Sequence, residues 1–528
     1  MPLPTTPKRD LRYILIFFTC CITHFLRFRI HLYCIYLCSS VFICGCFSAY
    51  AQPIPQSGTH LIPRQTTPYR PATKIPSSMP FRVGDTLTLP AYSFQLVGGG
   101  KYHTTTTCRY VGDHCYIFVE DDMWNTPRVT QTGIESLALA FDKSTARHPN
   151  RGIYETITDL FGDPPDVDAD PRILILVLDV LDSPITGITF VGYIDTDNEA
   201  PPVSREIIYI DARPLDIDSN LARATLAHEF QHLIHWKADS DEAKWLDEGC
   251  SEYAELACGY KDTTAAATKN FLSLAVNTDL THWEDQFFDF DQAYLYMTYF
   301  AQRYGDSALH KLVADPDSSI ASIDNVLQSL NAPERFGHLF GQWAAAMYLD
   351  GADDLGYRAI DLHPAKREVL TVPTNNLTRR ATRWGIDYLD LGETPGLAFT
   401  IQSTGDNDLL VTLIAEGDQP FAAPIPISAS QHKRIHTSGN IARTLAITST
   451  SGTTIDYTLS VSELASGPAT SDFDGDGEIS FSDFLAFASA FGKTAGDIGF
   501  DPTFDLDGDL RVTFSDFLIF VQNFGADF

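Results

Sequence analysis

Two histidines and a glutamate that could hold and use a zinc ion lie within five residues of this sequence. Residues 228–232 read HEFQH, an H-E-x-x-H motif, and residues 221–236 around it have the apolar spacing of a helix. Residues four apart lie on one helix face, so His228 and His232 can reach one Zn²⁺ while Glu229 approaches its bound water. The alternative is a surface helix that carries two unrelated histidines, because so short a motif also occurs by chance.

A candidate third ligand lies sixteen residues after His232, in the segment WLDEGCSEYAE at residues 245–255. We expect a second helix there. The two segments together resemble the gluzincin zinc peptidases, in which the Glu of a W-L-N-E-G sequence is the third zinc ligand. This resemblance implies that Glu248 completes the site. Asp247 stands where the family usually has Asn, a change that could alter the hydrogen bonds around the ligands without removing one.

Other polar residues near these segments could support the ligands or face solvent. The resemblance implies that Glu252 orients His228 through its second ring nitrogen, although a solvated helix face is an equal alternative. For Glu255 the solvated face is the favoured prediction. His235 is expected to be a packing or surface residue, and Ala238 excludes the third histidine of a metzincin.

Three protein ligands leave the fourth zinc position open for water, which Glu229 would deprotonate as general base before attack on a peptide carbonyl. Gluzincins also use a Tyr or His to stabilise the oxyanion, and Tyr294 in a Tyr-rich expected helix is our candidate. Tyr296, Tyr299 and His282 are the competing candidates. Because the G-x-M-E-N sequence of aminopeptidase gluzincins is absent, we predict a zinc metalloendopeptidase that takes protein or peptide substrates.

Two acidic repeats near the carboxyl end have the oxygen spacing of calcium-binding loops. The predicted ligands are Asp472, Asp474, Asp476, Glu478 and Asp483 in the first loop and Asp505, Asp507, Asp509, Arg511 and Asp516 in the second, with Glu478 and Arg511 using backbone carbonyls. Leu510 replaces the turn glycine of the first loop, Gly477, and is expected to strain the second. The alternative of a plain acidic linker is disfavoured by the duplicated spacing. The loops resemble dockerin modules, which implies Ca²⁺ and a cohesin-like scaffold partner.

The elements that must position these residues indicate a multidomain protein. We expect a signal peptide at 1–51, a Pro/Thr-rich linker without function at 52–80 and a β-rich amino-terminal region at 81–130. A helix at 131–142 and strands at 172–179 and 206–211 precede the motif helix, which should start near Ser219 or Asn220. The resemblance covers about residues 130–350 and implies an α+β zincin-like catalytic domain at 131–350. A β-sandwich is expected at 365–464, and the small α-helical dockerin-like module occupies 472–528.

Composition limits the partners. The net charge of −31 opposes binding to nucleic acid, and the chain is too polar for repeated membrane spans. Basic residues, two apolar runs and Ala49-Tyr50-Ala51 predict export, with cleavage before Gln52 and no membrane span in the mature chain. An uncleaved anchor and a lipoprotein signal are the alternatives. We therefore expect a secreted or cell-surface protein, in which Cys108 and Cys115 could form a disulfide across a hairpin.

Two other functions remain open at this stage. The protein could be a non-catalytic adhesion or scaffold protein whose zinc site is vestigial, although the intact Glu229 argues against that. It could also be a zinc hydrolase that acts on another bond, because the same chemistry serves esters and other amides.

Overall fold

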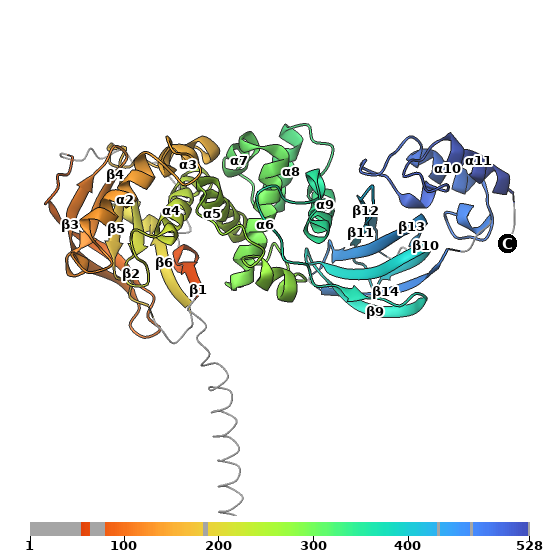
Figure 1. The fold of residues 1–528 in the computed structure, drawn as a ribbon, viewed down its shortest axis with the longest axis horizontal. Coiled ribbons are helices and arrows are strands. Elements are labelled where there is room, and N and C mark those ends of the chain that lie inside the picture. Colours follow the sequence, from red (N-terminus) through yellow and green to blue (C-terminus); the bar gives the residue numbers. More distant parts are fainter. Residues whose placement is uncertain are drawn as a thin grey trace, which may run out of the picture. The chain divides into compact units, whose positions relative to one another are not determined.

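The computed structural model describes residues 54–63, 80–182, 188–429, 433–452, 454–464 and 468–525 (Figure 1). The predicted signal peptide at 1–51 lies outside the described residues, as does most of the stretch at 52–80. Among the described residues, no helix is both long enough and apolar enough to cross a bilayer.

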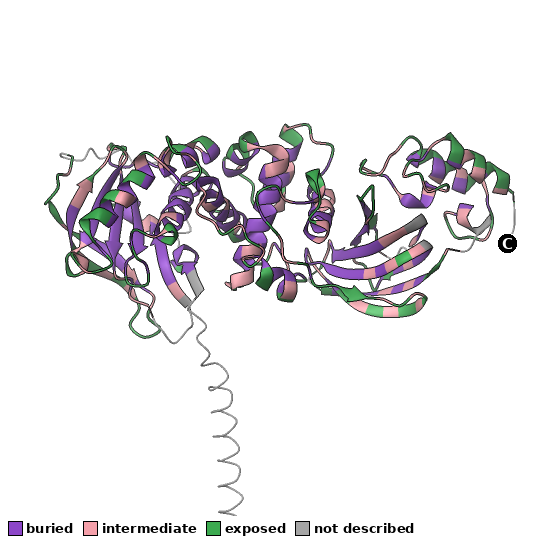
Figure 2. Cartoon of the chain, in the orientation of Figure 1, coloured by how far each residue is buried: buried purple, intermediate pink, exposed green. Residues whose placement is uncertain are grey.

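The first sheet is a seven-stranded mixed sheet, and the helices that carry the candidate zinc site follow it in the chain. Its strand order is β1-β6-β7-β5-β4-β3-β2. Strands β4, β5 and β7 are parallel to one another, and all their residues except Glu120 at the end of β4 are buried (Figure 2), whereas β6 runs antiparallel to β7. The strands are β1 (Ile54–Ser57), β2 (Thr86–Ser93), β3 (Gly100–Val111), β4 (Cys115–Glu120), β5 (Ile173–Leu178), β6 (Ile188–Ile194) and β7 (Ile207–Asp211).

Eight α-helices belong to the same part of the described chain. They are α2 (Gln131–Asp142), α3 (Ile153–Phe161), α4 (Asn220–Ala238), α5 (Lys244–Cys258), α6 (Phe287–Tyr304), α7 (Asp306–Val313), α8 (Ile320–Ser329) and α9 (Phe336–Leu349). Helix α2 has the predicted bounds, and α4 begins directly after Ser219, whose side chain caps it by accepting from the backbone N–H of Ala222 at 3.1 Å. The predicted strands at 172–179 and 206–211 are β5 and β7.

The region expected as a separate β-rich lead-in supplies β2, β3 and β4 to this sheet. Strands β3 and β4 form a hairpin, but the predicted disulfide across it is wrong. Cys108 lies opposite Phe118 in the hairpin register, and Cys108 and Cys115 are both buried free thiols. The two cysteines do not occupy facing positions, which a bridge between neighbouring strands requires.

A second sheet follows in the chain. Its strands are β8 (Glu368–Val369), β9 (Thr374–Thr382), β10 (Asp387–Ser403), β11 (Leu409–Ala415), β12 (Phe421–Ile427), β13 (Lys433–Ser449) and β14 (Thr454–Glu463). The described strands form one hydrogen-bonded sheet in the order β12-β11-β13-β10-β14-β9, with β8 beside β10. The β-sandwich stays a prediction. Strands β10 and β13 are 17 residues long each, so each can pair with different strands along its length, and bulges near Gly392 and Gly396 bend β10.

The last part of the chain has two similar units. Helices α10 (Phe481–Ala490) and α11 (Phe514–Asn523) each follow one acidic loop, as the repeats predict. Each helix begins with a capping box, formed by Ser480 with Asp483 and by Thr513 with Asp516.

Candidate metal centre

Helix α4 carries the H-E-x-x-H motif through the interior of the protein. Nearly every side chain from Ala222 to Trp236 is buried, so the polar residues of the motif are enclosed by apolar neighbours. Helix α5 packs beside it and ends at Gly259, whose φ of +80° suits a left-handed C-cap. Gly249 allows close packing of α5 on α6, because a Cβ there would lie 3.1 Å from the carbonyl oxygen of Ala293.

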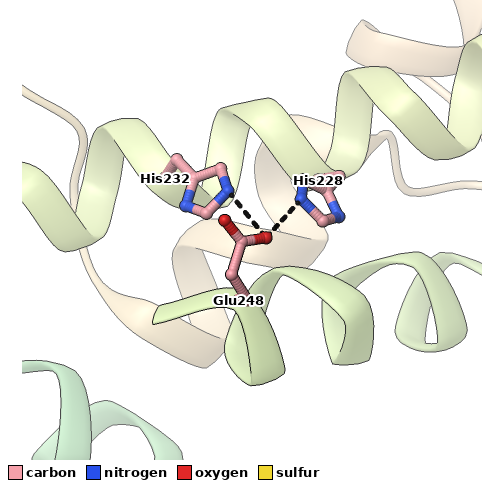
Figure 3. A group of neighbouring side chains, drawn as sticks. All are labelled: His228, His232 and Glu248. Carbon is pink, nitrogen blue, oxygen red and sulfur yellow. Dashed lines mark hydrogen bonds and ion pairs between the residues drawn. The ribbon is translucent and has the colours of Figure 1, made fainter. Parts of the chain in front are cut away.

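The structure brings the three predicted zinc ligands together. The Oε2 atom of Glu248 lies 3.2 Å from His228 Nε2 and 3.5 Å from His232 Nε2, and the two imidazoles on α4 face the carboxylate on α5 (Figure 3). One ligand atom from each residue falls within 4.8 Å of the others, and all three side chains are buried. This is the His₂Glu donor set of catalytic zinc sites.

The Nδ1 atom of each histidine meets a carboxylate of α5. His232 Nδ1 donates to Asp247 Oδ1 at 2.9 Å, and His228 Nδ1 donates to Glu255 Oε1 at 3.0 Å. Such bonds fix the ring orientation and leave the Nε2 lone pair for a metal. The Asp at 247, which departs from the usual Asn, is therefore a direct partner of a ligand. His235 is also buried, with its Nδ1 3.2 Å from Asp247 Oδ1.

The prediction for Glu255 is wrong. It does not lie on a solvated face but is the closer carboxylate to His228, whereas Glu252 Oε1 lies 3.7 Å from the same nitrogen. Lys261 joins the two acids, since its ammonium pairs with Glu252 and lies 3.3 Å from Glu255 Oε2. The sequence carried one signal for this arrangement: Glu255 follows Glu248 by seven residues, two helical turns, and so shares its helix face.

The donor set fits a divalent cation. His232 Nε2 and Glu248 Oε1 are buried atoms without a hydrogen-bond partner, which is costly unless another group meets them. Burial would raise the pKa of Glu248, yet the two imidazoles hold it well below its usual value, so the carboxylate is charged. Burial likewise opposes charge on His232, but Asp247 and Glu248 raise its pKa to about 9. The carboxylates thus favour positive charge at the point where the three ligands meet.

Glu229 is fully buried beside the ligands. Burial raises its pKa, while the neighbouring charges of His228 and His232 act in the opposite direction. Gly192 of β6 lies against this side chain, because a Cβ there would be 3.2 Å from Glu229 Cγ. Thr59 also reaches it and donates its hydroxyl to Glu229 Oε2 at 2.7 Å. No pattern in the sequence of the expected linker predicts this contact.

The structure puts the candidates for oxyanion stabilisation in different surroundings. Tyr294 is buried on α6, its hydroxyl lacks a hydrogen-bond partner, and its ring centroid lies 5.2 Å from Lys261 Nζ. Tyr296 packs in the core against Trp245, and Tyr299 donates its hydroxyl to the carbonyl of Asp354. The side chain of His282 is 64% exposed. The role of Tyr294 stays a prediction.

Both acidic loops gather carboxylates. Oxygen atoms of Asp472, Asp474 and Asp483 lie within 4.8 Å of one another, as do those of Asp505, Asp507 and Asp509. Backbone N–H groups of the loops donate to several of these carboxylates, for example Gly475 to Asp472 at 2.7 Å. Leu510 has a φ of +67°, the strained position that its place in the repeat predicts. The assignment of calcium stays a prediction.

No protein-family model matches this chain. Two solved structures resemble parts of this chain only weakly, and their TM-scores are too low to support an argument about its fold. A Yersinia pseudotuberculosis-derived mitogen is 13% identical over 18% of this chain and 91% of its own, with a TM-score of 0.15. The glucuronidase BtGH115A is 8% identical over 49% of this chain and 46% of its own, with a TM-score of 0.12.

A curated relative is more informative. The neutral metalloprotease ShpI of Staphylococcus hyicus is 24% identical over 249 residues, which is 42% of this chain and 54% of that protein. The match thus spans about half the length of the relative. This chain is a distant homologue of a neutral metalloprotease, and it carries a candidate zinc site at His228, His232 and Glu248.

Proposed function

We propose that this protein is a secreted zinc-dependent endopeptidase in which His228, His232 and Glu248 hold the metal and Glu229 is the general base. The observation that carries the proposal is the convergence of the three ligands beside a buried glutamate, with an oriented Nδ1 on each histidine. The similarity to ShpI supports peptides as the substrate class.

Each residue would have a defined task. A zinc ion bound here would activate a water molecule and polarise the scissile carbonyl. Glu229 is buried close to both histidines and would take the proton of the attacking water, then deliver it to the leaving amine. Its raised pKa suits a group that must both accept and return a proton. Tyr294 remains our candidate for stabilising the oxyanion.

We further propose that the two acidic loops bind Ca²⁺ and that the module resembling dockerins attaches the protein to a cohesin-like scaffold. Corresponding apolar side chains are exposed in the two units, since Phe481 and Phe514 are 64% and 61% exposed. Leu485 and Leu518, one turn further on, are 55% and 47% exposed. Repeated apolar positions of this kind are suited to docking. The predicted signal peptide supports export.

The test compares zinc content and casein cleavage in the parent and two variants. Glu229→Gln should retain about one zinc per chain and lose turnover, whereas Glu248→Ala should lose zinc. Equal zinc content in Glu248→Ala and the parent would refute the ligand assignment. Zinc binding without cleavage of proteins, but with cleavage of ester substrates, would favour another zinc hydrolase. Absence of zinc from the parent would favour a non-catalytic scaffold protein.

A further inference from the structure

Residues 56–62 lie in the candidate active site, although their composition predicts a linker. Gln56, Ser57, Thr59 and His60 are at most 7% exposed. Buried polar side chains of a short segment need specific partners. Their partners include the general base, one zinc ligand and the edge of the sheet beside them.

The first contact engages the general base. Thr59 Oγ1 donates to Glu229 Oε2 at 2.7 Å and accepts from the backbone N–H of Ile194 at 2.9 Å. One hydroxyl therefore joins β6 to one of the two oxygens of Glu229, whereas the other oxygen, Oε1, is buried without a hydrogen-bond partner. The segment therefore fills the space on the Oε2 side of the carboxylate, and a water molecule or substrate can reach Glu229 only from the side of Oε1.

The second contact fills the space beside a zinc ligand. His60 Nδ1 lies 3.6 Å from Glu248 Oε1, and His60 Nε2 lies 3.6 Å from Asp285 Oδ1. The ring also packs edge-on against Phe290 and Trp283, with centroid distances of 5.6 and 6.2 Å. The imidazole thus occupies a position enclosed by aromatic rings directly next to the metal centre.

The third contact covers the edge of the sheet. Strand β6 pairs with β7 on one side, and β1 is its neighbour on the other side. Gly58 donates its N–H to the carbonyl of Gly192 at 2.8 Å, at the residue that lies against Glu229. An extended peptide that paired with this edge of β6 would lie beside the general base. In this structure β1 already occupies the edge, so such a peptide could not pair there.

From these three contacts we infer that residues 56–62 are an internal inhibitor that covers the active site until the segment is displaced or removed. The inference rests on the proposed peptidase function. A segment that only assisted catalysis would need one hydroxyl or imidazole near the reacting groups. This segment instead contacts Glu229, lies beside Glu248 and pairs with the edge of β6. A peptide substrate would require the same three positions.

The test uses the full chain loaded with zinc, the double variant Thr59→Val with His60→Ala, and Leu61→Ala as a control in the same segment. Leu61 is 41% exposed, so its truncation should leave the contacts intact. Two quantities are measured: the rate of cleavage of a fluorogenic peptide, and the dissociation constant of a small fluorescent hydroxamate, which reports access to the zinc without turnover. The double variant should cleave about tenfold faster or more and bind hydroxamate tighter by a similar factor, as expected for the loss of a charge-assisted hydrogen bond. The control should match the parent.

Each outcome decides a different point. Equal rates and equal hydroxamate binding in parent and double variant would overturn the inhibitor while leaving the peptidase intact. A slower double variant with unchanged hydroxamate binding would overturn it in favour of a catalytic role for Thr59 or His60. If no variant cleaves peptides, the proposed peptidase fails, and tighter hydroxamate binding by the double variant would still support the cover. Absence of zinc from every variant would overturn both proposals.

A second measurement supplies the segment in trans. A synthetic peptide of residues 54–63 should slow the double variant in a dose-dependent way, and the same peptide with alanine at positions 59 and 60 should not. Equal effects of the two peptides would contradict the contacts of Thr59 and His60 as the source of inhibition.

Discussion

The carboxylate of Asp247 accepts a hydrogen bond from Nδ1 of His232 at 2.9 Å. Asp247 directly precedes the candidate ligand Glu248 in the sequence. One turn of α5 thus supplies both a candidate zinc ligand and the group that orients a second candidate ligand. Partners of this kind typically change metal affinity by about 10- to 100-fold when they are removed.

Replacement of Asp247 should weaken zinc binding. Asp247→Ala removes the acceptor for His232 Nδ1, so its zinc dissociation constant should rise about 10- to 100-fold, and Asp247→Asn should have a smaller effect because its amide oxygen can still accept. Competition with a chromophoric chelator measures both constants. Asp241→Asn, at an exposed position nearby, is the matched control. Unchanged zinc affinity in Asp247→Ala would exclude the orienting role.

Glu255 and Glu252 should differ in their effect on zinc. Glu255 lies 3.0 Å from His228 Nδ1 and Glu252 lies 3.7 Å away, so Glu255→Gln should raise the zinc dissociation constant about tenfold or more and Glu252→Gln less. The same chelator competition distinguishes them. A larger effect at Glu252 would restore the original assignment from the family resemblance. Thermal melting of both variants controls for the loss of the Lys261 ion pairs.

Calcium binding to the first acidic loop should depend on the acidic residues whose side chains are ligands, and much less on those that use only a backbone carbonyl. Asp472 is buried at loop position 1, so Asp472→Asn should weaken Ca²⁺ binding at least about tenfold. Glu478 is predicted to use its backbone carbonyl, and Glu478→Gln should therefore have a several-fold smaller effect. Isothermal titration calorimetry of the full chain measures both. Equal losses would refute the ligand positions, and no Ca²⁺ binding by the parent would refute the module.

Buried Asp211 should make stability fall as the pH rises. Burial, and then the carboxylates of Asp179 and Asp182, raise the pKa of Asp211 to about 8. In the unfolded chain this acid ionises near pH 4, so between about pH 4 and 8 the folded state holds a proton that the unfolded state has released. The free energy of unfolding therefore decreases with pH across that window, and the effect levels off above about pH 8.

The variant Asp211→Asn keeps an oxygen for the N–H groups of Val180 and Arg213 but cannot ionise. Its melting temperature should fall less than that of the parent between pH 5 and pH 9, as measured by calorimetry with the exposed Asp122→Asn as control. Parallel pH profiles of the parent and Asp211→Asn would show that Asp211 is not protonated in the folded protein.

Local sequence patterns predicted those parts of the site that depend on the geometry of a single helix. The four-residue spacing of His228 and His232 fixes both on one face of α4, and Ser219 caps the start of that helix. The helix at 131–142 and the strands at 172–179 and 206–211 were likewise predicted correctly, because their apolar patterns match the period of each element.

Tertiary structure decided how the other residues meet the site. The choice between Glu252 and Glu255 as partner of His228 depends on the angle at which α5 packs on α4, and no local pattern contains that angle. The strand order of the second sheet depends on the pairing of β10 with β13, which lie far apart in the sequence. The position of Cys108 relative to Cys115 depends on the register of the hairpin that β3 and β4 form. Thr59 reaches Glu229 across 170 residues of sequence. A threonine in a Pro/Thr-rich stretch carries no local sign of such a contact, because long-range packing alone brings it to the base.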